Sequence, residues 1–135
     1  SHRATDADIV DAETLVRLAG VHSLAFAAFH LAFWRLFDWK HELRKVALPT
    51  RAVTQILNLR LTYLFLGAGA AWFLFPRDLV HTPLGRAMLG FMAVFWLGRT
   101  VEQFVFLRVN DLRVHALTLL FVLGAVLFAA PLLVD

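Results

Sequence analysis

Residues 112–130 read LRVHALTLLFVLGAVLFAA, and after its first four residues this stretch contains one polar side chain, that of Thr118. A helix needs about 20 predominantly apolar residues to cross the hydrocarbon layer of a membrane, which is about 30 Å thick. Three further apolar stretches of comparable length precede this one in the sequence. The pattern therefore predicts an all-α membrane protein.

The fold that we expect is an antiparallel four-helix transmembrane bundle. Hydrophobic residues make up 60% of the chain, whereas soluble domains contain about 45–50%. Short connections make successive helices antiparallel neighbours. Ala19, Ser23 and Ala27 form a row of small side chains that lets another helix approach closely. Residues 1–135 then form a single transmembrane domain, with spans at about 13–37, 51–75, 83–109 and 112–131.

A short helix on the membrane surface is expected over about residues 39–48, between the first and second spans. At helical spacing, Trp39, Leu43 and Val46 share one face. The basic side chains fall largely elsewhere, namely Lys40, Arg44 and Lys45. An apolar face with basic residues around it is typical of a helix that lies in the membrane interface.

Proline and capping residues mark the expected ends of the helices. Proline cannot continue a helix, so Pro49, Pro76 and Pro131 are expected to end the surface helix, the second span and the fourth span. Thr82 is a suitable N-cap, and Pro83 suits the first helical position after it. Together they predict the start of the third span.

The composition excludes several classes of function. The chain contains no cysteine, which excludes disulfides, cysteine-ligated zinc, iron–sulfur clusters and thiol catalysis. Thirteen Lys and Arg against ten Asp and Glu give a net charge of +3. Basic loops of a membrane protein account for this excess, and no basic face of a soluble domain indicates a nucleic-acid partner. No nucleophile or metalloprotease motif is present, so no catalytic residue and no metal site are assigned.

Polar side chains of three predicted spans lie at a similar depth in the membrane. Counted from the connections at residues 38–50 and 110–111, these side chains are ~10–16 Å deep at 1.5 Å per residue. Residues of this kind are costly in lipid and often functional. We therefore expect them to line or adjoin one polar pocket, the candidate ligand-binding residues being His30, Asn58, Arg60, Arg99, Glu102 and Gln103.

Each of these residues also has a structural interpretation. Asn58 and Gln103 would form hydrogen bonds between helices, and His30 would be a core histidine. Arg99 and Glu102 share one helix face and would form an ion pair directed into the bundle, because lipid disfavours both charges. Arg60 lies about 200° around the helix from Asn58 at ~100° per residue, so the two cannot face the same point.

The functional hypothesis is an intramembrane pocket with a net positive charge. Two arginines against one carboxylate leave an excess of one positive charge among the candidate residues. Arg60 or Arg99 would hold an anionic group, because guanidinium groups bind carboxylates and phosphates through paired hydrogen bonds. Asn58 and Gln103 would orient that group, and Glu102 would adjust the charge. The expected ligand is an anionic or amphiphilic small molecule or a lipid headgroup.

Two alternatives come from other functional classes. The chain fits a structural or accessory subunit of a larger membrane complex, or a homo-oligomer, because small residues favour helix association in membranes. A b-type haem or metal-dependent oxidoreductase would use His30 and His115, whose depths differ by ~6 Å. No cofactor is assigned from the sequence.

The distribution of basic residues predicts that both ends of this sequence lie on the extracytoplasmic side of a bacterial inner membrane. Cytoplasmic loops carry an excess of Lys and Arg. One side has six such residues, Lys40, Arg44, Lys45, Arg51, Arg108 and Arg113. The other has four, Arg3, Arg17, Arg77 and Arg86. An alkaline phosphatase fused after Asp135 should be active, whereas activity of a cytoplasmic reporter at that position would contradict the orientation.

Overall fold

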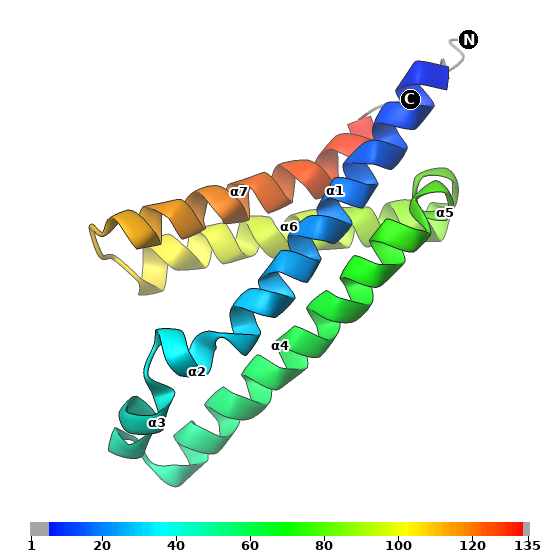
Figure 1. Cartoon of the computed structure of the whole chain (residues 1–135). Coiled ribbons are helices and arrows are strands. Elements are labelled where there is room, and N and C mark those ends of the chain that lie inside the picture. The colour runs from blue at the N-terminus through cyan, green and yellow to red at the C-terminus, as the bar shows by residue number, and fades with distance from the viewer. Residues whose placement is uncertain (1–5, 134–135) are drawn as a thin grey trace. The chain divides into compact units, whose positions relative to one another are not determined.

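The structure is a computed structural model, which describes the backbone of residues 6–133 and the side chains of residues 12–133. Arg3, which entered the charge count above, lies outside the described residues. The elements are α1 (Asp6–Leu31), α2 (Phe33–Leu36), α3 (Trp39–Glu42), η1 (Leu43–Lys45), α4 (Leu48–Leu74), α5 (Pro76–His81), α6 (Pro83–Phe106) and α7 (Leu112–Leu133), as Figure 1 shows. Residues 6–133 contain no strand. The expectation of an all-α protein is confirmed.

Three helical segments are long and apolar enough to cross a membrane, namely Ala12–Leu31 of α1, Leu48–Leu74 and Leu112–Leu133. The fourth long helix, α6, has 24 residues but is not among them. Its sequence carries Arg86, Arg99, Glu102 and Gln103. Three of the four expected spans are thus helices that could cross a membrane by length and composition.

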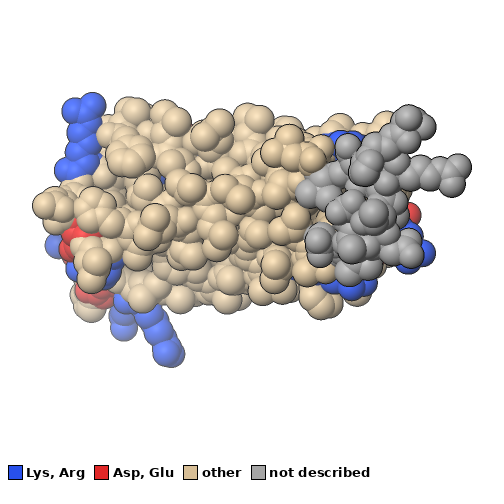
Figure 2. Space-filling model, turned by 90° about the horizontal axis from the view of Figure 1, so that it is seen from above, with Lys and Arg blue, Asp and Glu red and all other residues tan. Residues whose placement is uncertain are grey.

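Large apolar side chains lie on the surface of the chain, as they do in proteins surrounded by lipid. Leu84, Phe106 and Leu112 are 74%, 81% and 83% exposed. Figure 2 shows one face on which residues other than Lys, Arg, Asp and Glu make up most of the surface. Soluble monomers rarely expose apolar surface on this scale, which supports the assignment to a membrane.

The chain consists of two compact units. One comprises residues 20–71, with the end of α1, the short helices and most of α4. The other comprises residues 1–19 and 72–135, with the start of α1, the end of α4, and α5, α6 and α7.

In the unit of residues 20–71, α1 and α4 pack closely where both carry small residues. A Cβ atom built on Gly69 of α4 would lie 2.7 Å from Cγ of Leu24 and 3.0 Å from the Gly20 carbonyl oxygen. Ser23 and Ala27, from the predicted row of small residues, are both fully buried. A glycine at position 69 therefore permits the close approach of the two helices.

The segment between α1 and α4 differs from the expected single surface helix. Three short helical pieces occupy residues 33–45. Asp38 separates α2 from α3 with a left-handed backbone conformation, at φ 49° and ψ 48°. A non-glycine residue in this conformation interrupts a right-handed helix. The first long helix ends at Leu31, before α2 and rather than near residue 37, and α3 with η1 ends at Lys45.

In the other unit, α6 and α7 are joined at both ends by hydrogen bonds. Near the start of α6, Nη2 of Arg86 donates to the Leu132 carbonyl oxygen at 2.9 Å. Near its end, Nε2 of Gln103 donates to the Val114 carbonyl oxygen at 3.3 Å. The rings of Trp96 and Phe121 stack between these points, with centroids 5.8 Å apart. The two helices are therefore antiparallel and in contact along their length (Figure 1).

The start of α6 lies where its capping residues predicted it, whereas the three prolines expected to end helices lie within helices. Oγ1 of Thr82 accepts a hydrogen bond from the Gly85 backbone N–H at 3.0 Å, so Thr82 caps α6 as predicted. Pro49 and Pro76 lie in the first turns of α4 and α5 rather than ending helices, and Pro131 lies inside α7. Proline is tolerated in a first turn because the N–H that it lacks has no partner there.

Two glycines of α4 provide a matched test of the close packing. We expect Gly69→Ala to lower the unfolding free energy by about 1–3 kcal/mol, because the new methyl group must displace Leu24 and the Gly20 backbone. A Cβ atom at Gly67 meets nothing within 4 Å, so Gly67→Ala should not destabilise the protein. Denaturant titration in detergent, followed by circular dichroism, measures both changes. Equal stabilities of the two variants would refute this packing.

Candidate functional site

The C-terminal half of α6 carries a group of polar side chains in the unit of residues 1–19 and 72–135. Arg99, Glu102 and Gln103 stand three and four residues apart, so helical geometry places them on neighbouring positions of one face. Gln103 is buried, Arg99 is partly buried and Glu102 is exposed. The expectation that Glu102 faces the interior is therefore wrong for this residue.

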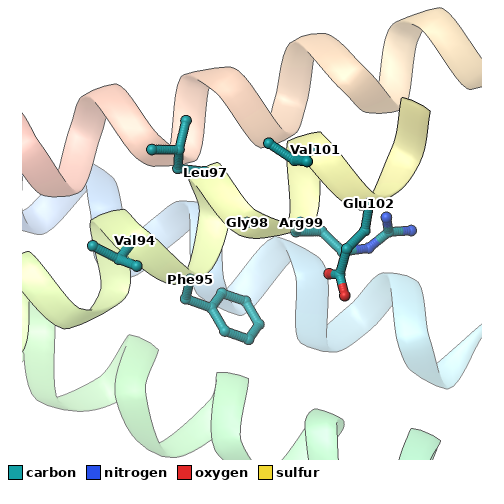
Figure 3. A pocket seen from close by; sticks show the side chains of 7 residues that line it. All are labelled: Val94, Phe95, Leu97, Gly98, Arg99, Val101 and Glu102. Atoms are coloured by element: carbon teal, nitrogen blue, oxygen red, sulfur yellow. The ribbon is translucent and has the colours of Figure 1, made fainter. Parts of the chain in front are cut away.

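The Arg99 guanidinium packs on an aromatic ring. Its Cζ atom lies 4.5 Å from the ring centroid of Phe121 on α7, within the range of a cation–π interaction. No ion pair between Arg99 and Glu102 forms among the described side chains. Figure 3 shows their charged ends pointing in different directions. The two charged groups are therefore close in sequence but are not joined by a direct ion pair.

Two open pockets adjoin these side chains. The larger has a volume of about 540 Å³ and is lined by Val94, Phe95, Leu97, Gly98, Arg99, Val101 and Glu102 (Figure 3). The smaller, of about 270 Å³, is lined by Arg99, Glu102, Gln103, Phe106 and Leu107. A Cβ atom at Gly98 would meet nothing within 4 Å. We call the surface formed by both pockets the α6 groove.

Gln103 has a structural role at the edge of this groove. Its side chain is 2% exposed and bonds to the Val114 carbonyl oxygen in the first turn of α7. The predicted hydrogen bond between helices is confirmed for this residue. Phe121 and Gly98 could not be predicted as parts of the site, because neither the apolar pattern of α7 nor a glycine within α6 indicates a ligand.

His30 and Asn58 meet in the other unit, of residues 20–71. Nδ2 of Asn58 donates to the His30 carbonyl oxygen at 3.0 Å. His30 lies in the last turn of α1, where carbonyl groups lack donors within their own helix. The His30 ring lies 4.4 Å from that of Phe33 and 5.1 Å from that of Phe65, centroid to centroid. Both residues thus contribute to packing, as their structural interpretations predicted.

Arg60 lies apart from Asn58 within the same unit. Its side chain is exposed, and its Cζ atom lies 5.6 Å from the ring centroid of Tyr63, which is itself exposed. Asn58 is buried. The expectation that the two residues face different directions is confirmed.

The described residues offer no metal centre. Residues 12–133 contain no group of three His, Asp or Glu side chains placed to hold a metal ion. His115 is exposed, and its Nε2 lies 2.8 Å from Oδ1 of Asn110. His115 and His30 belong to different units.

Two titratable groups in the connections have shifted pKa values. A hydrogen bond of 2.9 Å to the Asp38 carboxylate raises the pKa of His41 above its usual 6.5. The backbone N–H of Arg113 donates to Asp111 at 2.8 Å and lowers the pKa of that carboxyl below its usual value. Both effects stabilise the charged forms of these residues.

No protein-family model, curated protein or solved structure matches the chain. The α6 groove itself indicates what could bind there. Arg99 offers up to five N–H donors in a planar arrangement suited to a phosphate or carboxylate. The exposed Glu102 offers acceptors for an N–H donor, and the apolar side chains of the larger pocket suit a hydrocarbon chain.

Proposed function

We propose that this chain is an integral membrane protein that binds the charged headgroup of an amphiphile, such as a lipid, in the α6 groove. The observation that carries the proposal is the position of Arg99. Its guanidinium packs on Phe121, forms no ion pair with Glu102 among the described residues, and lines an open apolar pocket.

The proposal includes α6 as a fourth span. Its contacts with α7 support this, because α7 is one of the three candidate spans. The hydrogen bonds made by Arg86 and Gln103 are 17 residues apart on α6, or ~26 Å at 1.5 Å per residue. A helix attached to a spanning neighbour over this length shares its depth in the bilayer.

With four spans, short connections place both ends of the sequence on one side of an inner membrane. The segment from α2 to η1 would then lie at the opposite surface. Exposed Lys40, Arg44 and Lys45 support this, since anionic lipid surfaces attract such residues. Trp39 lies beside them, and tryptophan is common at membrane interfaces.

The depth of the α6 groove suits a lipid headgroup. Because α6 ends at Phe106 rather than near residue 109, Arg99 is ~10 Å and Glu102 ~6 Å from the end of the helix. A long arginine side chain can extend from that depth toward the headgroups. An uncompensated charge at the centre of a spanning helix costs about 2.5–3.5 kcal/mol on insertion scales, and a bound phosphate would offset this cost for Arg99.

A second candidate function is a subunit of a membrane complex that contacts another helix at the α6 groove. The open space at Gly98 favours it, because small residues let transmembrane helices approach closely. Glu102 would then bond to a polar group of the partner. Crosslinking through a cysteine introduced at Val94 would detect such a partner, and exclusively monomeric protein would argue against it.

Replacement of Arg99 tests the lipid-binding proposal. We expect Arg99→Gln to weaken the binding of phosphatidylethanolamine and phosphatidylglycerol about tenfold or more, since a hydrogen bond to a charged group contributes about 1.5–3 kcal/mol. Native mass spectrometry of the protein titrated with each lipid measures this. The control is Arg17→Gln, which removes the same charge from an exposed position of α1. Equal lipid binding by wild type and both variants would refute the proposal.

A further inference from the structure

The α6 groove contains one charge of each sign, and this bears on which headgroup it would select. Arg99 and Glu102 both line the larger and the smaller pocket. They are three residues apart, which places their Cβ atoms ~5–6 Å from each other on the helix surface. Arg60, which gave the predicted pocket its positive excess, lies on α4 in the other unit. The two groove charges therefore sum to zero.

A headgroup with only negative charge fits this pair poorly. Its phosphate could bind Arg99, but Glu102 would lie close to the same negative charge. Like charges at this separation repel, and they do so more strongly where water is scarce. A headgroup that carries both a phosphate and an ammonium group would satisfy both side chains.

The type of ammonium group also matters. A carboxylate accepts hydrogen bonds, and charge-assisted bonds of this kind are about twice as strong as neutral ones. A primary ammonium has three N–H donors for Glu102, whereas a quaternary ammonium has none. The groove should therefore distinguish these two groups although their charges are equal.

The apolar part of the groove suits an acyl chain of the same molecule. From Glu102 back to Val94 the larger pocket follows α6 for eight residues, or ~12 Å. The side chains along it include Leu97 and Val101, and Gly98 leaves open space between them. Figure 3 shows these residues along one stretch of α6 that ends at the two charged side chains.

We infer that the α6 groove selects a zwitterionic lipid with a primary ammonium, of the phosphatidylethanolamine class, with its phosphate on Arg99 and its ammonium on Glu102. This inference rests on the proposed function and adds the chemical class of the ligand. In this assignment, Arg99 provides most of the binding affinity through the phosphate, and Glu102 determines which headgroup is preferred.

The test compares three lipids with identical acyl chains by native mass spectrometry of the full chain. We expect wild-type protein to bind phosphatidylethanolamine about tenfold more tightly than phosphatidylcholine or phosphatidylglycerol. Glu102→Gln should remove this preference and strengthen binding of phosphatidylglycerol. Glu42→Gln, which removes an exposed carboxylate from α3 in the other unit, is the matched control and should keep the preference.

The outcomes separate the inference from the proposed function. If wild-type protein binds all three lipids equally and Arg99→Gln still weakens all of them, the headgroup assignment is wrong and the binding site stands. If Arg99→Gln changes nothing, both are wrong. A Glu102→Gln variant that fails to fold leaves the comparison of ethanolamine with choline in wild-type protein, where equal affinities overturn the inference.

Discussion

The attachment of α6 to α7 is the constraint on which the rest of the account depends. Hydrogen bonds from Arg86 and Gln103 join the two helices at opposite ends, and the stacked rings of Trp96 and Phe121 fill the space between them. The very apolar helix α7 therefore packs against α6, which carries two arginines and a glutamate. In the proposed topology, the contacts with α7 offset the cost of placing these charges in a spanning helix.

The same attachment determines which polar groups of α6 are occupied by contacts within the protein. Gln103 faces α7 and is occupied by the Val114 carbonyl oxygen, so its role is to hold the helices together. Arg99 lies at the edge of the contact, where Phe121 supports its guanidinium from one side. Glu102 lies farther around the helix and is exposed. The angle around α6 thus separates Gln103, which holds the helices together, from Arg99 and Glu102, to which the proposal assigns the ligand.

The sequence predicted the long helices well, because runs of apolar residues indicate helices locally. It also predicted the start of α6, because Thr82 and Pro83 are a local capping signal. It did not predict that the first long helix ends at Leu31, since no proline or glycine lies next to Ala32 to indicate a break there. The six candidate residues were grouped by their predicted depth in the membrane. Depth does not indicate the direction in which a side chain points around its helix. Asn58 therefore proved to be buried while Arg60 is exposed, and Glu102 points away from the helix contact that Gln103 makes. Tertiary packing decides these orientations.

The position of α6 in the bilayer is the central claim, and the absence of cysteine from the sequence makes it directly measurable. A single cysteine at Gly98 fits without steric conflict, because a Cβ atom there meets nothing within 4 Å. In intact membranes, a spin label at this position should be relaxed by oxygen far more than by a water-soluble nickel complex. A cysteine at the exposed Ala47 should show the opposite preference. Strong relaxation of the label at position 98 by the nickel complex would show that α6 does not lie in the hydrocarbon layer.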